Sequence, residues 1–267
     1  MIESREFDGV KMIRMGREQG GRVLYWVAAF LVDGLLVDTG PAYCSDELAA
    51  HLAGKTVTAA VNTHHHEDHI AGNRFLLDRG VRVFAHPDAL DLIAVRPALF
   101  PYQEMVWGYP EPTRPEPAPD EIVTPGHRFQ VTPTPGHSRG HLCLFEADRG
   151  WLFTGDLFVS EKLKTVRPQE EIGLMAAEME MLADLPGPRL VLFNAIGSIV
   201  SDGRAALRAC AAHFRRVIAE ARRLSAEGLA PAAIRDRIFG RESSLAVMTQ
   251  GDFSTENLIK SSLRAGN

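Results

Sequence analysis

Histidine and aspartate side chains crowd into one short stretch of this chain. Four of its ten histidines lie within six residues together with Asp68: His64, His65, His66 and His69. Residues two apart on an extended segment point to the same side, so His64 and His66 can reach one ion while His65 points away. Imidazole and carboxylate groups bind zinc and other divalent metals. Since exposed imidazoles gain nothing from crowding together, the pattern HxHxDH predicts a metal site.

Two later segments carry side chains of the same kinds. Thr134-Pro-Gly-His137 places a histidine in a turn that its proline and glycine force. Phe153-Thr-Gly-Asp156 places a carboxylate directly after an apolar run, and the two oxygens of Asp156 could bridge two ions. We therefore assign both segments to the predicted site.

Two polar residues beside these candidates are expected to support them. Asp38, in Asp38-Thr-Gly-Pro, is placed either to hydrogen-bond a ligand histidine or to cap its own turn, and we favour the first interpretation. His141 follows His137 by four residues. We expect it to orient the turn around His137 or to line the pocket rather than to bind an ion.

Together these motifs resemble those of the metallo-β-lactamase superfamily. THHHEDH, TPGHSRGH and TGD follow one another in that family's order and spacing, roughly between Leu24 and Gly203. The match looks closer to the glyoxalase II, lactonase and general metallo-hydrolase branches than to antibiotic-degrading enzymes, whose loop sequences differ. The resemblance implies an α+β fold, a four-layer αββα sandwich with the metals at one edge of its two central sheets.

Carried over residue by residue, the resemblance implies six ligands: His64, His66 and His137 for a first ion, Asp68 and His69 for a second, and Asp156 as the bridge. Asp68 would also be catalytic, by orienting the reactants or accepting a proton. The implied cofactor is zinc, one or two ions per chain, with iron or manganese as alternatives. The implied reaction is attack of metal-bound hydroxide on an ester, thioester, lactone or amide bond, because zinc lowers the pKa of bound water to about 7 and polarises the carbonyl.

One position departs from the family's pattern. Members usually carry a last histidine after a strand, and Ile196 occupies that position here. An isoleucine cannot bind a metal, so the second ion would keep three protein ligands, which can still support a catalytic zinc. We expect a weaker second site or a one-metal enzyme, with Asn194, Ser198 and Asp202 as candidate substitutes.

Two other classes of function remain open. Relatives of the implied fold include iron oxidoreductases, namely persulfide dioxygenases with one iron and flavodiiron proteins with two, and His/Asp ligands do not separate zinc from iron. The 267 residues contain no flavodoxin-like domain, which argues against the two-iron type. A degenerate member that binds a metal without catalysis is the third possibility, and the six retained ligand positions argue against it.

The overall composition limits the classes of partner that this protein is expected to bind. With 45% hydrophobic residues, 24% charged residues and a net charge of −5, the chain is typical of a globular protein and has no basic stripe for nucleic acid. It shows no signal-peptide run and no membrane span, and its three cysteines form no CxxC pair. We expect a cytoplasmic protein with a small-molecule substrate, no membrane partner, and a homodimer as a possible assembly.

Strands and helices alternate around the motifs, as in a layered sandwich. Two apolar runs flank Asp33-Gly34 and predict a hairpin. Strands are predicted at 22–32, 35–37, 56–62, 81–85, 128–132, 141–146, 151–154 and 189–193, and helices at 45–52, 70–79, 88–94, 169–184, 203–227, 231–239 and 254–263. We expect residues 1–203 to form the metallo-β-lactamase-like domain and residues 204–267 a helical C-terminal extension packed on it. The proline-rich stretch Pro97–Pro119 is predicted to be irregular, as a lid or a stiff surface loop.

Overall fold

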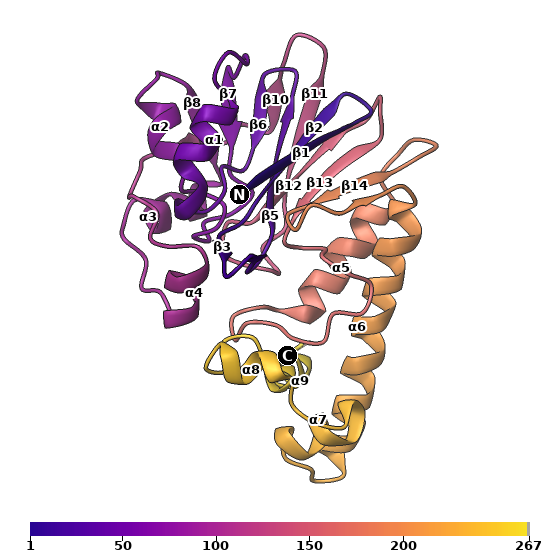
Figure 1. The fold of residues 1–267 in the computed structure, drawn as a ribbon. Coiled ribbons are helices and arrows are strands. Elements are labelled where there is room, and N and C mark those ends of the chain that lie inside the picture. Colours follow the sequence, from indigo (N-terminus) through magenta and orange to yellow (C-terminus); the bar gives the residue numbers. More distant parts are fainter. Residues whose placement is uncertain (266–267) are drawn as a thin grey trace.

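Two β-sheets lie face to face in the computed structural model, which describes residues 1–265, and helices cover their outer faces (Figure 1). The first sheet has the order β1-β2-β5-β6-β7-β8-β9, and the second runs β10-β11-β12-β13-β14-β15. This is the predicted α+β class and αββα sandwich.

The strands of both sheets are short. In the first sheet they are β1 (Ile2–Phe7), β2 (Val10–Met15), β5 (Val27–Val32), β6 (Leu35–Val37), β7 (Ala59–Val61), β8 (Arg82–Ala85) and β9 (Glu116–Pro117), with β3 (Glu18–Gln19) and β4 (Arg22–Val23) forming a separate hairpin. In the second sheet they are β10 (Glu121–Val123), β11 (Arg128–Pro133), β12 (Leu142–Glu146), β13 (Trp151–Gly155), β14 (Val191–Asn194) and β15 (Ile199–Val200).

Parallel pairing brings distant motifs to a common edge of each sheet. Strands β6, β7 and β8 are parallel neighbours, so Asp38 after β6 and the histidine-rich loop after β7 leave the first sheet together. Strands β13 and β14 are also parallel, so Asp156 and Ile196 leave the second sheet together. Loops at the carboxyl ends of parallel strands are where such sheets build sites.

Three hydrophobic clusters separate the four layers. Phe30, Phe153 and Phe193 lie in the cluster between the sheets, where Phe153 and Phe193 stack with ring centroids 4.9 Å apart. A second cluster packs the first sheet against α1 (Ser45–His51) and α2 (Asn73–Leu77). The third packs the other sheet against α5 (Ile172–Ala183), α6 (Gly203–Ala226), α7 (Pro231–Phe239) and α9 (Thr255–Arg264).

Most predicted elements occur close to their expected limits, and the differences have local causes. Residues 22–32 do not form one strand, because Arg22 and Val23 pair with Glu18 and Gln19 in their own hairpin. The predicted helix at 70–79 begins only at Asn73, because the N–H groups of residues 71 and 72 donate to the carbonyls of residues 40 and 39. Ser45 is the first residue of α1 rather than its N-cap, which is Cys44.

The proline-rich stretch is more regular than predicted. It contains α4 (Pro101–Val106), whose first residue is Pro101. At the start of this helix the side chain of Gln103 accepts a hydrogen bond from the N–H of Phe100 at 2.7 Å. Short helices α3 (Leu90–Ile93) and α8 (Ser244–Met248) complete the set. The boundary at residue 203 stays a prediction. None of the helices within residues 1–265 combines the length and apolar character needed to cross a bilayer.

Candidate metal centre

Four of the six predicted ligands converge on one point. One ligand atom from each of His64, His66, His137 and Asp156 lies within 4.8 Å of the other three. The three histidines are at most 6% exposed. They come from the loop after β7 and the turn after β11, while Asp156 follows β13, so both sheets contribute. Their number and type fit a divalent metal that prefers nitrogen and oxygen.

Spacing within this group is compatible with a shared metal ion. Nδ1 of His66 lies 3.2 Å from Nε2 of His137. Two nitrogens that are each about 2.0–2.1 Å from a tetrahedral zinc lie about 3.3 Å apart, which is close to that separation. Nε2 of His64 is buried and has no hydrogen-bond partner among residues 1–265. A bound ion would satisfy it.

The two remaining predicted ligands lie on the other side of Asp156. Nε2 of His69 is 3.6 Å from Oδ2 of Asp68 and 3.8 Å from Oδ1 of Asp156. The second oxygen of Asp156, Oδ2, lies 3.8 Å from His137 and 4.0 Å from His64. Each oxygen of Asp156 therefore faces a different donor set, which is the arrangement of a bridging carboxylate.

Protonation of these buried groups follows from their surroundings. Burial lowers the pKa values of His64 and His66 well below the ordinary value, reinforced by neighbouring imidazoles at His64 and by Arg167 and neighbouring imidazoles at His66, so both are neutral as metal ligands must be. Burial raises the pKa of Asp68 to about 7. Burial alone would lower the pKa of His69, but the carboxylates of Asp68 and Asp38 outweigh it and raise that pKa to about 10.

Asp38 occupies the supporting position expected of it. Its Oδ2 lies 3.0 Å from Nδ1 of His69, and it also accepts hydrogen bonds from the N–H and the hydroxyl of Thr63 at 2.7 and 2.8 Å. The backbone at Asp38 has φ of 60°, an unusual conformation for aspartate that turns the chain towards the loop. Asp38 thus joins the end of β6 to both ends of the metal loop.

His141 is fully buried and supports Asp156 rather than adding a ligand. Its Nδ1 contacts the hydroxyl of Thr134 at 2.8 Å, and its Nε2 accepts a hydrogen bond from the N–H of Asp156 at 3.3 Å. Both ring nitrogens are therefore engaged. His65 packs its ring against His66, 4.8 Å between centroids, and is absent from the converging group.

Local structure around Ile196 leaves two of its three predicted substitutes, Asn194 and Asp202, engaged elsewhere. The side chain of Asn194 accepts a hydrogen bond from the N–H of Ser198 at 2.8 Å and donates to the carbonyl of Val159. Asp202 caps α6 by accepting from the N–H of Ala205 at 3.2 Å. Neither side chain belongs to the converging group among the described residues.

Three residues beside the site escaped the sequence analysis: Glu67, Arg167 and Glu170. Oε2 of Glu170 lies 3.5 Å from Nδ1 of His137, which has no hydrogen-bond partner among the described residues. Glu67 and Arg167 form a buried ion pair behind the metal loop. Glu67 stands inside the HxHxDH motif, but only the folded chain reveals what it contacts.

Aromatic side chains from three segments form a continuous row next to the metal loop. Tyr25 packs edge-on against Trp107, Trp107 against Tyr102, and Tyr102 against Phe253, with centroids 5.7, 5.9 and 6.4 Å apart. Tyr25 is 45% exposed. Burial and the charges of Asp156 and Asp68 raise the pKa of Tyr25.

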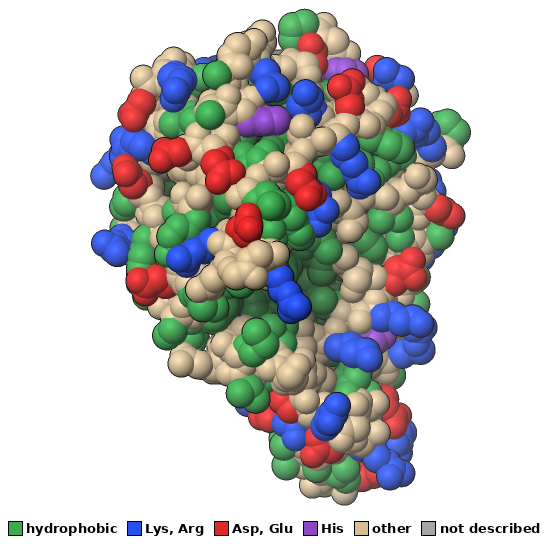
Figure 2. Space-filling view, in the orientation of Figure 1, with side chains coloured by type: hydrophobic (Ala, Val, Ile, Leu, Met, Phe, Trp, Pro, Cys, Tyr) green, Lys and Arg blue, Asp and Glu red, His purple; other side chains and the backbone are tan. Residues whose placement is uncertain are grey.

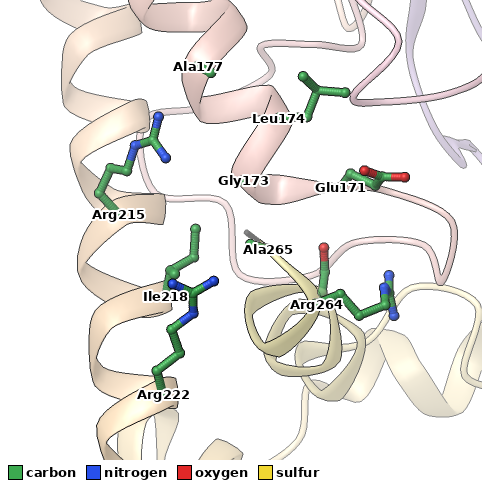
Figure 3. Close-up of a pocket in the computed structure, with 10 residues that line it drawn as sticks. Glu171, Gly173, Leu174, Ala177, Arg215, Ile218, Arg222, Arg264 and Ala265 are labelled. Atoms are coloured by element: carbon green, nitrogen blue, oxygen red, sulfur yellow. The ribbon is translucent and has the colours of Figure 1, made fainter. Parts of the chain in front are cut away.

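A separate cavity of about 420 Å³ lies between α5, α6 and α9 (Figure 3). The residues that line it within the described chain include none of the predicted ligands. Of its three arginines, Arg215 pairs with Glu180 at 2.8 Å, and Arg264 donates to the carbonyl of Pro168 at 2.9 Å. This cavity is therefore distinct from the candidate metal centre.

Curated relatives of this chain include several hydroxyacylglutathione hydrolases. The one from Synechococcus sp. is 30% identical over 136 residues, which are 50% of this chain and 47% of that protein. The one from Xanthomonas campestris is 34% identical over 164 residues, 60% of this chain and 55% of that protein. The chain thus spans about half the length of the curated relatives it matches.

Solved structures extend the likeness of fold to nearly the whole chain. A beta-lactamase domain protein from Burkholderia ambifaria has a TM-score of 0.75 at 20% identity, covering 97% of this chain and 86% of that one. A metallo-beta-lactamase family protein from Thermus thermophilus has a TM-score of 0.68 at 20% identity, covering 97% and 92%. The family model of the metallo-beta-lactamase superfamily matches residues 27–211. This chain belongs to the metallo-beta-lactamase superfamily.

Proposed function

We propose that this protein is a metal-dependent hydrolase that cleaves an ester, thioester, lactone or amide bond of a small molecule. The observation that carries the proposal is the position of Asp156, whose two oxygens face two different sets of buried donors. In our assignment His64, His66 and His137 hold one ion, Asp68 and His69 hold the second, and Asp156 bridges. Zinc is the cofactor we propose.

The roles of the side chains follow from their surroundings. A divalent ion held in this site would supply an activated water and would polarise the substrate's carbonyl group. The neutral imidazoles of His64 and His66 present lone pairs to that ion. Asp68, whose Oδ2 lies 3.6 Å from Nε2 of His69, is the residue we assign to orient the attacking water or accept its proton.

The substrate class draws on two further observations. The names of the matched relatives, hydroxyacylglutathione hydrolases, support a thioester as the first substrate to test. Tyr25 is exposed, and Phe100 just before α4 and Met105 within α4 are 41% and 44% exposed, so these side chains offer apolar surface to an acyl group. Figure 2 shows hydrophobic side chains gathered around the hollow in the middle of one face. We propose a thioester or ester with an apolar acyl part.

The test begins with elemental analysis of protein purified without added metal. We expect one to two zinc ions per chain. We also expect the protein to hydrolyse thioesters or lactones, and the substitution His66→Gln to abolish this hydrolysis. The matched control is His51→Gln, on α1 and outside the converging group, which should retain full activity. Fully zinc-loaded protein that hydrolyses no thioester, ester, lactone or amide would overturn the proposal. Bound iron together with oxygen uptake would favour an oxidoreductase instead.

A further inference from the structure

One buried arginine ties the metal loop to the C-terminal extension. Arg167 is 5% exposed, and its guanidinium lies 3.5 Å from Oε1 of Glu67 on one side and 3.5 Å from Oδ2 of Asp252 on the other. Its third neighbour is the ring of Phe253, with a centroid 4.9 Å away. Both carboxylates are also buried, at 4% and 6% exposure. A buried charge is tolerated only with such partners, so these groups fix one another's positions.

On the side of the metal loop, Glu67 stands between two predicted ligands. Its neighbours along the chain are His66 and Asp68, one for each proposed ion. The carboxylate of Glu67 also accepts a hydrogen bond from the side-chain amide of Gln103 at 2.7 Å. A shift of Glu67 would therefore move a ligand of both ions.

On the other side, the C-terminal segment holds the loop that carries Arg167. The backbones of Val166 and Ser254 exchange hydrogen bonds at 3.2 and 3.3 Å, and the amide of Asn257 donates to the carbonyl of Val166 at 3.1 Å. Asp252 also accepts a hydrogen bond from the hydroxyl of Tyr102 in α4. Residues 252–257 thus hold Arg167 through both backbone and side-chain contacts.

The same loop reaches the first proposed ion. The N–H of Arg167 donates to Oε1 of Glu170 at 2.9 Å, and Oε2 of Glu170 lies 3.5 Å from Nδ1 of His137. The hydroxyl of Ser261 in α9 donates to the carbonyl of Glu170 at 2.7 Å. The loop therefore contacts the metal centre at Glu67 and at His137, and the C-terminal helix supports both contacts.

We propose that Arg167 is a positioning residue of the metal centre, and that residues 252–257 of the C-terminal extension hold it in place. The inference rests on the metal binding in the proposed function. It gives the C-terminal extension a role beyond packing on the domain through an amphipathic face, because its contacts reach segments that carry the predicted metal ligands. Partners that orient metal ligands typically change metal affinity by about 10–100-fold when they are removed.

The experiment compares three variants by the binding of Co²⁺, whose visible absorption reports the coordination geometry. The double variant Arg167→Met/Glu67→Gln removes both members of one ion pair and leaves Asp252 with the hydroxyl of Tyr102 as its partner. Arg215→Met/Glu180→Gln is the matched control, because the same pair of residue types links α5 and α6 at 2.8 Å on the surface. Asp252→Asn tests the C-terminal contact alone. Urea unfolding checks that each variant is folded.

We expect the Arg167→Met/Glu67→Gln variant to bind Co²⁺ about 10–100-fold more weakly and with an altered absorption spectrum. Asp252→Asn should weaken binding in the same direction, whereas the surface control should bind Co²⁺ as the unmodified protein does. An unchanged affinity and spectrum in both Arg167→Met/Glu67→Gln and Asp252→Asn would overturn the inference. If the double variant fails to fold, Asp252→Asn, which preserves side-chain shape, decides the question.

The two proposals fail in different ways. Unmodified protein that binds Co²⁺ but hydrolyses nothing would overturn the hydrolase assignment and leave the role of Arg167 intact. Variants with unchanged Co²⁺ binding would overturn the role of Arg167, whatever the protein hydrolyses.

Discussion

Oδ2 of Asp38 lies 3.0 Å from Nδ1 of His69, and the opposite nitrogen of the same ring faces Asp68 and Asp156. The contact therefore determines which nitrogen is available to an ion. A carboxylate in this position also makes the imidazole more basic and a stronger ligand.

Replacing Asp38 with asparagine tests this relationship. Asp38→Asn preserves the side-chain shape but removes the negative charge beside His69, so we expect metal affinity at the Asp68–His69 position to fall by about 10–100-fold. Competition with a chromophoric chelator measures the affinity. Asp148→Asn, on the exposed turn between β12 and β13, is the control and should bind normally. Equal affinities in the two variants would show that Asp38 only caps its turn.

Ile196→His should restore a missing ligand. Ile196 follows β14, which pairs in parallel with the strand that leads to Asp156, so a histidine there leaves the same edge of the sheet. We expect metal content, measured by elemental analysis, to rise towards two ions per chain. Ile196→Ala removes the isoleucine without adding a donor and serves as the control. Equal stoichiometry in the histidine and alanine variants would dispose of the idea that the second position is depleted.

How far the sequence predicts the fold depends on how local the signal is. Asp33-Gly34 between two apolar runs predicts the β5–β6 hairpin, and both residues have positive φ as that turn requires. Asp8-Gly9 carries the same signal and turns β1 into β2, yet this hairpin was not predicted. The reason is that β1 is a mostly exposed edge strand, so its residues lack the apolar alternation that marks a strand.

The residues of the candidate site also differ in whether a local sequence pattern reveals them. Crowded histidines in THHHEDH are evident in the sequence because ligand types and their spacing are local. Arg167 is 100 residues from Glu67 and is not remarkable in its own segment. Its role depends on which loops the two sheets and the C-terminal helices bring together. A buried arginine or glutamate cannot be recognised until burial itself is known.

Glu178 gives the fold a specific pH dependence. This carboxyl is 6% exposed, and only its Oε1 has a partner, the N–H of Gly136 at 2.9 Å. Burial raises the pKa of Glu178 from 4.5 to about 7. Between those values the folded protein binds more protons than the unfolded chain, so the contribution of Glu178 to the free energy of unfolding decreases as pH rises from 4.5 to 7.

The glutamine in Glu178→Gln cannot ionise, so this variant should not lose stability as the pH rises from 4.5 to 7. Relative to the unmodified protein, the variant is expected to gain about 1–2 kcal/mol in the free energy of unfolding between pH 4.5 and pH 8, less than the whole shift implies because solvent screens part of it. Urea unfolding of metal-free protein at the two pH values measures the difference. Glu180→Gln is the control on the same helix, because the hydrogen bond to Arg215 lowers the pKa of Glu180 below 4.5, so this variant should change little between pH 4.5 and pH 8. If the free energies of unfolding of Glu178→Gln and the unmodified protein differ by the same amount at both pH values, the prediction is refuted.

Removal of the metal should lower the free energy of unfolding as well as the hydrolytic activity. Nε2 of His64 and Nε2 of His69 are buried without hydrogen-bond partners among residues 1–265, so an ion that binds them stabilises only the folded chain. At zinc concentrations a thousandfold above Kd, we expect the free energy of unfolding to rise by about 4 kcal/mol over chelator-treated protein. His64→Gln should abolish most of this increment, whereas His51→Gln should preserve it. If zinc stabilises His64→Gln as much as the unmodified protein, the ion binds elsewhere, because a glutamine at this position cannot replace the imidazole that closes the three-histidine site.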